Sequence, residues 1–219
     1  MIDKILEIIG QNKKNTTPDK EALAAALEEE LSQLLIMEGA APRPEPDLRT
    51  IGLFSDVSEE RIAELIHALL YLDELNHISE KKQPITFYLS TYGGSADDMF
   101  GMYDIMRVVR ERSEIHTVGI GKVMSAGVIL LAAGTKGERK IGKNCRLMIH
   151  SVIGGNHGPL HNLLNEMEAV EQIQKMYIDC LVQETNLSKK QLKKLLERKV
   201  NVYLSAEEAV EYGIADVII

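Results

Sequence analysis

Ser125 is the residue whose surroundings best suit covalent chemistry, because it stands where an apolar strand gives way to an apolar helix. The run Gly119–Gly127 places it at a helix start, where unpaired main-chain N–H groups and the helix dipole favour a developing negative charge. A serine hydroxyl there can attack a carbonyl carbon while the N–H group of Ala126 helps to hold the oxyanion. The run is not the GxSxG pattern of an α/β-hydrolase, since Val123 stands at the first glycine position.

A glycine pair, Gly93-Gly94, marks a second strand-to-helix junction. Because glycine has no side chain, main-chain N–H groups can approach a ligand closely there. We expect the N–H groups of Gly94 and Ala126 to form the oxyanion site together. Each motif also has a simpler explanation, since a glycine pair after a strand is commonly only a turn and a serine at a helix start is commonly only an N-cap.

His150 is the histidine best placed for a cleft, although a lone histidine is structural more often than catalytic. It ends the apolar strand Leu147–Ile149 and opens into the glycine-containing run Ser151–Gly155, a position that suits a cleft. The remaining histidines lie on predicted helices, turns or a strand start and are interpreted as structural: His67, His77, His116, His157 and His161.

The composition excludes several classes of function. The formal net charge is -8, whereas a general nucleic-acid binder needs concentrated Lys and Arg, so we expect no nucleic-acid partner. Cys145 and Cys180 stand far apart with no Cys/His ligand spacing, which predicts neither a metal site nor a disulfide scaffold. No apolar stretch approaches the about 20 residues that span a bilayer, and residues 1–14 make a poor signal peptide, so we predict a cytoplasmic protein without a membrane partner.

The elements that must position these residues alternate between strand and helix. Strands are predicted over 49–54, 84–90, 115–121, 146–149 and 214–219. Helices are predicted after Ser58, from Ser95, over 125–133, over 160–184, after Ser188 and after Ser205. The last two begin with capping boxes, in which Gln191 and Glu208 stand three residues after the serine. Repeated strand–turn–helix units predict an α/β fold with a mainly parallel sheet.

Residues 1–47 form a separate N-terminal extension in this interpretation, and residues 48–219 form the main domain. An amphipathic helix is predicted from Pro18 to about Met37, followed by a proline-rich hinge over 41–46. This helix could pack on the domain, gate a pore or bind a partner, and plain packing is the simplest of the three.

Four segments together resemble the proteolytic subunit of the Clp protease family, ClpP. They are GKVMSAGVILLAAG at 121–134, RLMIHSVIGG at 146–155, YLSAEEAVEYGIAD at 203–216 and YGGSADDMFGMYDIM at 92–106. The resemblance covers roughly residues 48–219 and implies a ClpP/crotonase-like fold of repeated β-α units with a protruding handle helix. It implies a serine endopeptidase in which Ser125 is the nucleophile and His150 the base. Gly94 and Ala126 would supply the oxyanion N–H groups.

The same resemblance implies partners. The chain would self-associate into heptameric rings, two of which stack through their handle helices into a tetradecamer that encloses a proteolytic chamber. Unfolded polypeptides would be the substrates, delivered by an AAA+ Clp unfoldase. The sequence has no GxxxxGK[ST] phosphate loop, so ATP would be used by that partner, and we expect this chain to carry no cofactor.

The chain departs from the family pattern at the third position of the catalytic triad, where Asn201 replaces the usual aspartate. An asparagine oxygen can accept the N–H of His150, but it cannot stabilise an imidazolium with a full charge. Val200 also replaces an arginine that helps to join the two rings in the family. Ring stacking could therefore be weaker or built differently.

Three functions stay open at this point. The first is an endopeptidase with a Ser-His-Asn variant triad, whose activity could be reduced. The second is a catalytically weak or inactive ring subunit that co-assembles with an active paralogue. The third is a crotonase-like acyl-CoA enzyme, which the pairing of Ser125 with His150 disfavours.

Overall fold

The computed structural model describes residues 48–79, 82–197 and 201–219. The chain divides into two units, Met1–Asp47 and Leu48–Ile219, and the account below concerns the second. The helix predicted from Pro18 to about Met37 and the proline-rich hinge after it lie outside the described residues, so both stay predictions.

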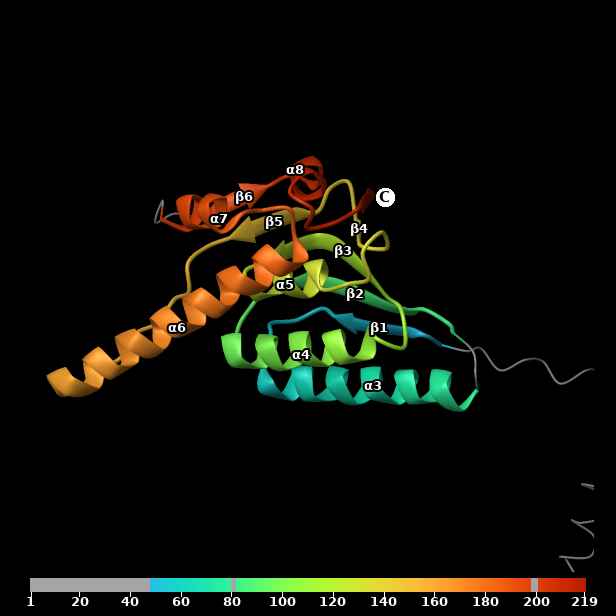
Figure 1. The fold of residues 1–219 in the computed structure, drawn as a ribbon, viewed down its shortest axis with the longest axis horizontal. Helices are drawn as coiled ribbons and strands as arrows, with labels where there is room; N and C mark the ends of the chain where they lie inside the picture. The colour runs from blue at the N-terminus through green and yellow to red at the C-terminus, as the bar shows by residue number, and fades with distance from the viewer. Residues whose placement is uncertain (1–47, 80–81, 198–200) are drawn as a thin grey trace, which may run out of the picture. The chain divides into compact units, whose positions relative to one another are not determined.

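A seven-stranded sheet forms the centre of the domain (Figure 1). Its strands are β1 (Thr50–Leu53), β2 (Ile85–Thr91), β3 (Ile115–Met124), β4 (Lys140–Ile141), β5 (Arg146–Ile149), β6 (Val202–Leu204) and β7 (Val217–Ile218). The order β1-β2-β3-β4-β7 is parallel throughout, as the alternation of strands and helices predicts. The α/β fold class with a mainly parallel sheet is confirmed.

Strand β3 pairs with two different strands on the same side. Its residues Val118 and Gly119 pair with β4, and Lys122–Met124 pair with β5, both in parallel. Strand β5 then pairs antiparallel with β6. This fork brings the carboxyl ends of β3 and β5 side by side, so that the residues after Met124 and after Ile149 become neighbours.

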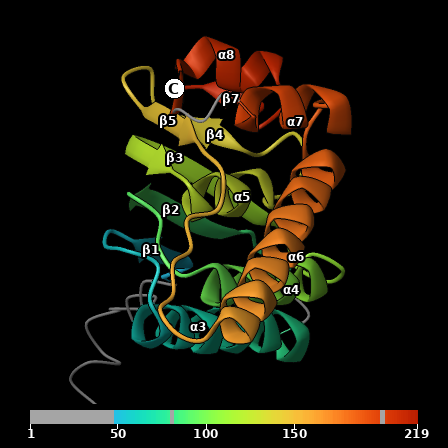
Figure 2. The same cartoon turned by 90° about the vertical axis from the view of Figure 1, so that its left-hand side faces the viewer.

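Six helices surround the sheet within the described residues: α3 (Glu59–Ile78), α4 (Ala96–Val109), α5 (Ala126–Ala132), α6 (Leu160–Glu184), α7 (Lys189–Leu196) and α8 (Ala206–Glu211). Helices α3 and α4 pack side by side next to β1, and α5 lies between the strands and α6 (Figures 1 and 2). Among the described residues, no helix combines the length and apolar composition needed to cross a membrane.

The long helix α6 has two unlike halves. Its buried residues all lie in the last two turns, at Tyr177, Ile178, Leu181 and Glu184. Its first half projects beyond the rest of the domain (Figure 1), and apolar residues such as Leu164 and Met167 are exposed there. The protruding helix predicted over 160–184 is confirmed with the same bounds.

Local signals predicted some elements better than others. Both capping boxes are present, with Ser188 accepting from the N–H of Gln191 and Ser205 from that of Glu208. Ser58 does precede α3, but its side chain makes no capping hydrogen bond. Strands β4 and β6 were not expected, because two or three residues are too few for a period to show.

Candidate active site

Ser125 occupies a strained junction between β3 and α5. Its φ of 53° and ψ of -123° make it the one residue other than glycine with a positive φ among the described residues. Such a conformation costs about 1–3 kcal/mol and persists only where the surroundings enforce it. The N–H of Ser125 donates to the Met148 carbonyl on β5 at 2.8 Å. All seven residues of α5 behind it are buried, so the strain is held by the core.

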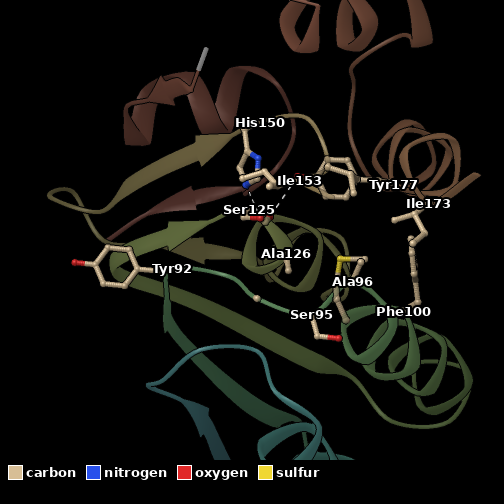
Figure 3. A pocket seen from close by; sticks show the side chains of 13 residues that line it. Tyr92, Ser95, Ala96, Phe100, Ser125, Ala126, His150, Ile153, Ile173 and Tyr177 are labelled. Atoms are coloured by element: carbon tan, nitrogen blue, oxygen red, sulfur yellow. Dashed lines mark hydrogen bonds between the residues drawn. The ribbon is translucent and has the colours of Figure 1, made fainter. Parts of the chain in front are cut away.

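His150 reaches Ser125 from the end of β5. Its Nε2 lies 2.8 Å from the Ser125 Oγ, and Figure 3 shows the imidazole pointing at the hydroxyl. The other ring nitrogen, Nδ1, lies 2.5 Å from the carbonyl oxygen of Ser151. A carbonyl can only accept, so this contact requires the proton to sit on Nδ1. The lone pair of Nε2 then faces the serine hydroxyl, which is the arrangement that a general base needs.

Asn201 lies close to this pair in the sheet register but does not join it. Residues Ile149 and Val202 pair across the β5–β6 ladder, and one further step along the ladder would set His150 opposite Asn201. Asn201 is exposed, and within the described residues it makes no hydrogen bond to the imidazole. The Ser151 carbonyl occupies Nδ1 instead. The orienting role predicted for Asn201 therefore stays a prediction.

The two predicted oxyanion donors both line the pocket in front of Ser125. Gly94 has a φ of 150° and forms an isolated parallel bridge with Val57. That bridge uses the Gly93 carbonyl and the Ser95 N–H, which leaves the N–H of Gly94 outside the pairing. Ala126 is the first residue of α5, so its N–H has no acceptor one turn back within the helix.

Both glycines of the pair are required by space as well as by conformation. A Cβ on Gly93 would lie 2.6 Å from the Ser125 Cβ, and a Cβ on Gly94 would lie 2.2 Å from the main-chain oxygen of Val57. Both residues have a positive φ, which residues other than glycine rarely adopt. The glycine pair is therefore more than a turn, because it lets the chain pass directly against the candidate nucleophile.

A pocket of about 350 Å³ opens beside Ser125 and His150. Most of its remaining walls are apolar or aromatic and come from α4, α6 and the residues after His150: Met99, Phe100, Val152, Ile153, Ile173 and Tyr177. Sequence reasoning gave these residues no role in the site. Nothing in their spacing indicated that they face one pocket.

The site contains no arrangement typical of a metal centre. The described part of the chain has no group of three or more His, Cys, Asp or Glu side chains placed to hold a metal ion. Cys145 and Cys180 are both free, and burial raises the pKa of each thiol to about 11. A thiol with a raised pKa is a poor nucleophile at neutral pH, so neither cysteine competes with Ser125 for that role.

The comparisons with known proteins agree with this geometry. The sequence matches the Clp protease family over residues 46–219. It is 33% identical to the ATP-dependent Clp protease proteolytic subunit 2 of Corynebacterium jeikeium over 169 residues, which cover 77% of each chain. It is 32% identical to proteolytic subunit 1 of Prochlorococcus marinus over 171 residues, covering 78% of this chain and 84% of the relative.

A third relative is similar to about the same extent. The ATP-dependent Clp protease proteolytic subunit of Oltmannsiellopsis viridis is 31% identical over 168 residues, which cover 77% of this chain and 82% of the relative. The matched region contains the sheet, the projecting helix and all of the candidate site residues. This chain belongs to the Clp protease family.

Proposed function

We propose that this chain is a serine endopeptidase, the proteolytic subunit of an ATP-dependent Clp-type protease that cleaves unfolded polypeptides. The observation that carries the proposal is the 2.8 Å contact between the Ser125 Oγ and the His150 Nε2. It is supported by the Nδ1 contact to the Ser151 carbonyl, which leaves Nε2 free to accept a proton. The N–H groups of Gly94 and Ala126 line the same pocket.

The reaction follows from these groups. The Ser125 Oγ attacks the carbonyl carbon of the scissile peptide while its proton passes to the His150 Nε2. The electron pair of the carbonyl moves onto its oxygen, where the N–H groups of Gly94 and Ala126 stabilise the charge. Collapse of this intermediate breaks the C–N bond, and the leaving amine takes the proton from Nε2.

An ester between Ser125 and the acyl half of the substrate remains. Water attacks this ester and gives a proton to the His150 Nε2, and a second oxyanion forms in the same position. Its collapse breaks the bond to Oγ and releases a carboxylic acid, and the proton on Nε2 returns to Ser125. Both halves of the cycle use the same base and the same donors, so no cofactor is assigned to this chain.

Asn201 is the proposed third member of a Ser-His-Asn triad. Its side-chain oxygen could accept from Nδ1 in place of the Ser151 carbonyl, which would keep the same tautomer. Neither acceptor carries a formal charge, so the imidazolium formed during the reaction lacks the stabilisation that an aspartate supplies. We therefore expect the peptidase activity to be low compared with that of an enzyme with an aspartate.

The proposal includes an assembly. Exposed apolar residues on the projecting half of α6, including Leu160, Leu164 and Met167, favour contact with a second protein surface. We expect heptameric rings that stack through these helices into a tetradecamer, with an AAA+ unfoldase that hydrolyses ATP. A cytoplasmic location also stays a prediction.

A second candidate function is a weak or inactive ring subunit that assembles with an active paralogue. The exposed position of Asn201 and the missing negative charge beside His150 favour it. A crotonase-like acyl-CoA enzyme is not supported by a comparable observation, since the Ser125–His150 contact serves hydrolysis through a covalent intermediate.

The deciding experiment compares the purified protein with its Ser125→Ala variant. A fluorophosphonate probe should label Ser125, and a small fluorogenic peptide should be hydrolysed, with both signals lost in the variant. Sizing of both proteins on the same column controls for assembly. Rings of unchanged size that show neither labelling nor hydrolysis would contradict the peptidase and favour the inactive subunit.

A further inference from the structure

A hydroxyl group that the mechanism above does not use lies against the nucleophile. Tyr177, on the buried half of α6, is 5% exposed, and its ring forms part of the pocket wall. Its hydroxyl lies 3.3 Å from the main-chain oxygen of Ser125. Figure 3 shows Tyr177 and His150 approaching Ser125 from different elements, one to the carbonyl and one to the hydroxyl.

The direction of this hydrogen bond is unambiguous. A carbonyl oxygen can only accept, so the tyrosine hydroxyl donates. Burial raises the pKa of Tyr177 well above its ordinary value, so the hydroxyl keeps its proton at neutral pH. The Ser125 oxygen accepts a second bond, from the N–H of Val128 at 3.0 Å. Its carbonyl is thus fixed from two sides.

The carbonyl of Ser125 and the N–H of Ala126 belong to one peptide unit. In a trans peptide these two groups point in opposite directions within one plane, so a bond that orients the carbonyl also orients the N–H. A donor on the carbonyl oxygen also polarises the amide, and hydrogen bonds in such chains strengthen one another. Tyr177 therefore acts on the Ala126 N–H from the far end of the same peptide.

We propose that Tyr177 is a positioning residue for the oxyanion site: its hydroxyl holds and polarises the Ser125–Ala126 peptide, so that the Ala126 N–H donates more strongly to the oxyanion. This inference rests on the proposed peptidase function and on Ala126 as a donor. Tyr177 does not touch the substrate's reacting atoms, so its effect is confined to the transition state and to adducts that carry an oxyanion.

Helix α6 is anchored to the core, which keeps the Tyr177 hydroxyl next to the Ser125 carbonyl. One and two turns after Tyr177, Leu181 and Glu184 are buried, and Glu184 pairs with Arg110, the residue that caps the C-terminus of α4. The tyrosine ring is thus held by a helix that packs on the core, and its hydroxyl cannot swing away without moving α6.

The test removes only the hydroxyl, in Tyr177→Phe. We expect kcat on a fluorogenic peptide to fall about three- to tenfold with KM unchanged, the size of effect that one hydrogen bond supplies. The affinity for a peptide aldehyde, which forms an oxyanion-like adduct with Ser125, should fall by the same factor. The affinity for the matching peptide alcohol, which forms no adduct, should not change.

The matched control is Tyr103→Phe, which removes another buried hydroxyl with a hydrogen bond, to Glu184 at 2.9 Å, away from the pocket. It should leave kcat and the aldehyde affinity unchanged. If Tyr177→Phe keeps its rings and also keeps both values, the inference is wrong. If it lowers the aldehyde and alcohol affinities equally, Tyr177 only shapes the pocket and the inference is again wrong.

A second substitution covers the case in which Tyr177→Phe does not fold. Tyrosine at 177 is replaced by 3-fluorotyrosine, whose hydroxyl is a stronger donor in nearly the same volume, and kcat and aldehyde affinity should both rise. No rise in either would overturn the inference. The Ser125→Ala variant separates a failure of the proposed function from a failure of the inference about Tyr177. Activity that survives in Ser125→Ala refutes the proposed serine peptidase. Activity that depends on Ser125 but not on Tyr177 refutes only the inference about Tyr177.

Discussion

Ser125 is followed by a helix whose seven residues are all buried, whereas His150 is followed by a stretch that is exposed from Ile153 to Pro159. The main chain of Ser125 is bound by β5 through its N–H, and by Tyr177 and Val128 through its carbonyl. The side chains of Ser125 and His150 thus lie 2.8 Å apart but belong to very different surroundings.

The part of the site that carries His150, here termed the base side, is held in place by a few polar contacts instead of a buried core. The Ser151 hydroxyl donates to the Leu196 carbonyl at 3.0 Å, and the N–H of Val152 donates to Gln174 on α6 at 2.7 Å. The imidazole is oriented by a neighbouring main-chain carbonyl, and no carboxylate within residues 48–79, 82–197 and 201–219 is hydrogen-bonded to it. Ser125, the proposed nucleophile, is therefore preorganised by the fold, while the orientation of His150, the proposed base, is set near the surface. The two sides should respond differently to mutation.

The largest expected effect comes from Gly94→Ala on the nucleophile side. The new methyl group would lie 2.2 Å from the main-chain oxygen of Val57, and the φ of 150° disfavours any side chain. The backbone must shift and carry the candidate oxyanion donor with it. We expect peptidase activity to fall by about 10²- to 10³-fold, as when one oxyanion donor is removed, measured as kcat on a fluorogenic peptide.

Gly155→Ala on the base side is the matched control. A Cβ there meets no atom within 4 Å, and its φ is not positive. Stability and activity should stay near those of the parent, with a change in the free energy of unfolding within about 0.5 kcal/mol. Equal losses in the two variants would remove the distinction between a rigid nucleophile side and a tolerant base side.

The next largest effect concerns the anchor of α6. Glu184 is 3% exposed and pairs with Arg110 at 2.8 Å. Glu184→Gln keeps the shape but leaves the partly buried guanidinium without its counter-charge. We expect the free energy of unfolding in urea to fall by about 2–4 kcal/mol. Asp179→Asn on the same helix breaks an exposed pair with Lys189 and should show no measurable change.

The pH dependence of this anchor has a definite sign. Burial opposes ionisation of Glu184, but the hydrogen bonds and charge of Arg110 outweigh it and lower the pKa of the carboxyl below its ordinary value. A lowered pKa contributes stability that is fully present above the pKa of the unfolded chain. That stability is lost as the pH falls through the lower pKa of the folded chain. Urea unfolding of the parent and of Glu184→Gln should therefore converge in acid and diverge towards neutral pH. Curves that stay parallel would contradict this.

The smallest expected effect is a gain, from Asn201→Asp. A carboxylate that reaches Nδ1 would displace the Ser151 carbonyl and stabilise the imidazolium with a full charge. We expect kcat to rise by about tenfold, while KM stays constant. Such a gain would distinguish the two sides of the site further, because a surface substitution is expected to raise kcat only on the side that carries His150.

Asn201→Ala distinguishes two ways in which the imidazole of His150 could be oriented. If the Ser151 carbonyl alone orients His150, the alanine variant should keep the parent rate, whereas a working Ser-His-Asn triad should lose activity. A rate that does not rise in Asn201→Asp, with the fold and the column elution volume of the parent protein, would mean that position 201 does not act on the imidazole.

Much of this was readable in the sequence because the signals are local. The period of apolar residues and the capping boxes predicted α6, α7 and α8, and the motifs around Ser125 and His150, with the family resemblance they carry, predicted which two residues lie together. A helix period or a cap depends on neighbours within about four residues, so it leaves a trace in the sequence.

Only the tertiary structure decided the contacts that join distant segments. The Tyr177 hydroxyl donates a hydrogen bond to the carbonyl of a residue 52 positions away, and no local pattern around Tyr177 indicates that contact. The two- and three-residue strands β4 and β6 are too short to show a period of their own, and they form where the longer strands β3 and β5 align them. The acceptor of His150 Nδ1 likewise depends on how the chain turns after β5. Such approaches are set by packing of the whole core, and no local pattern encodes them.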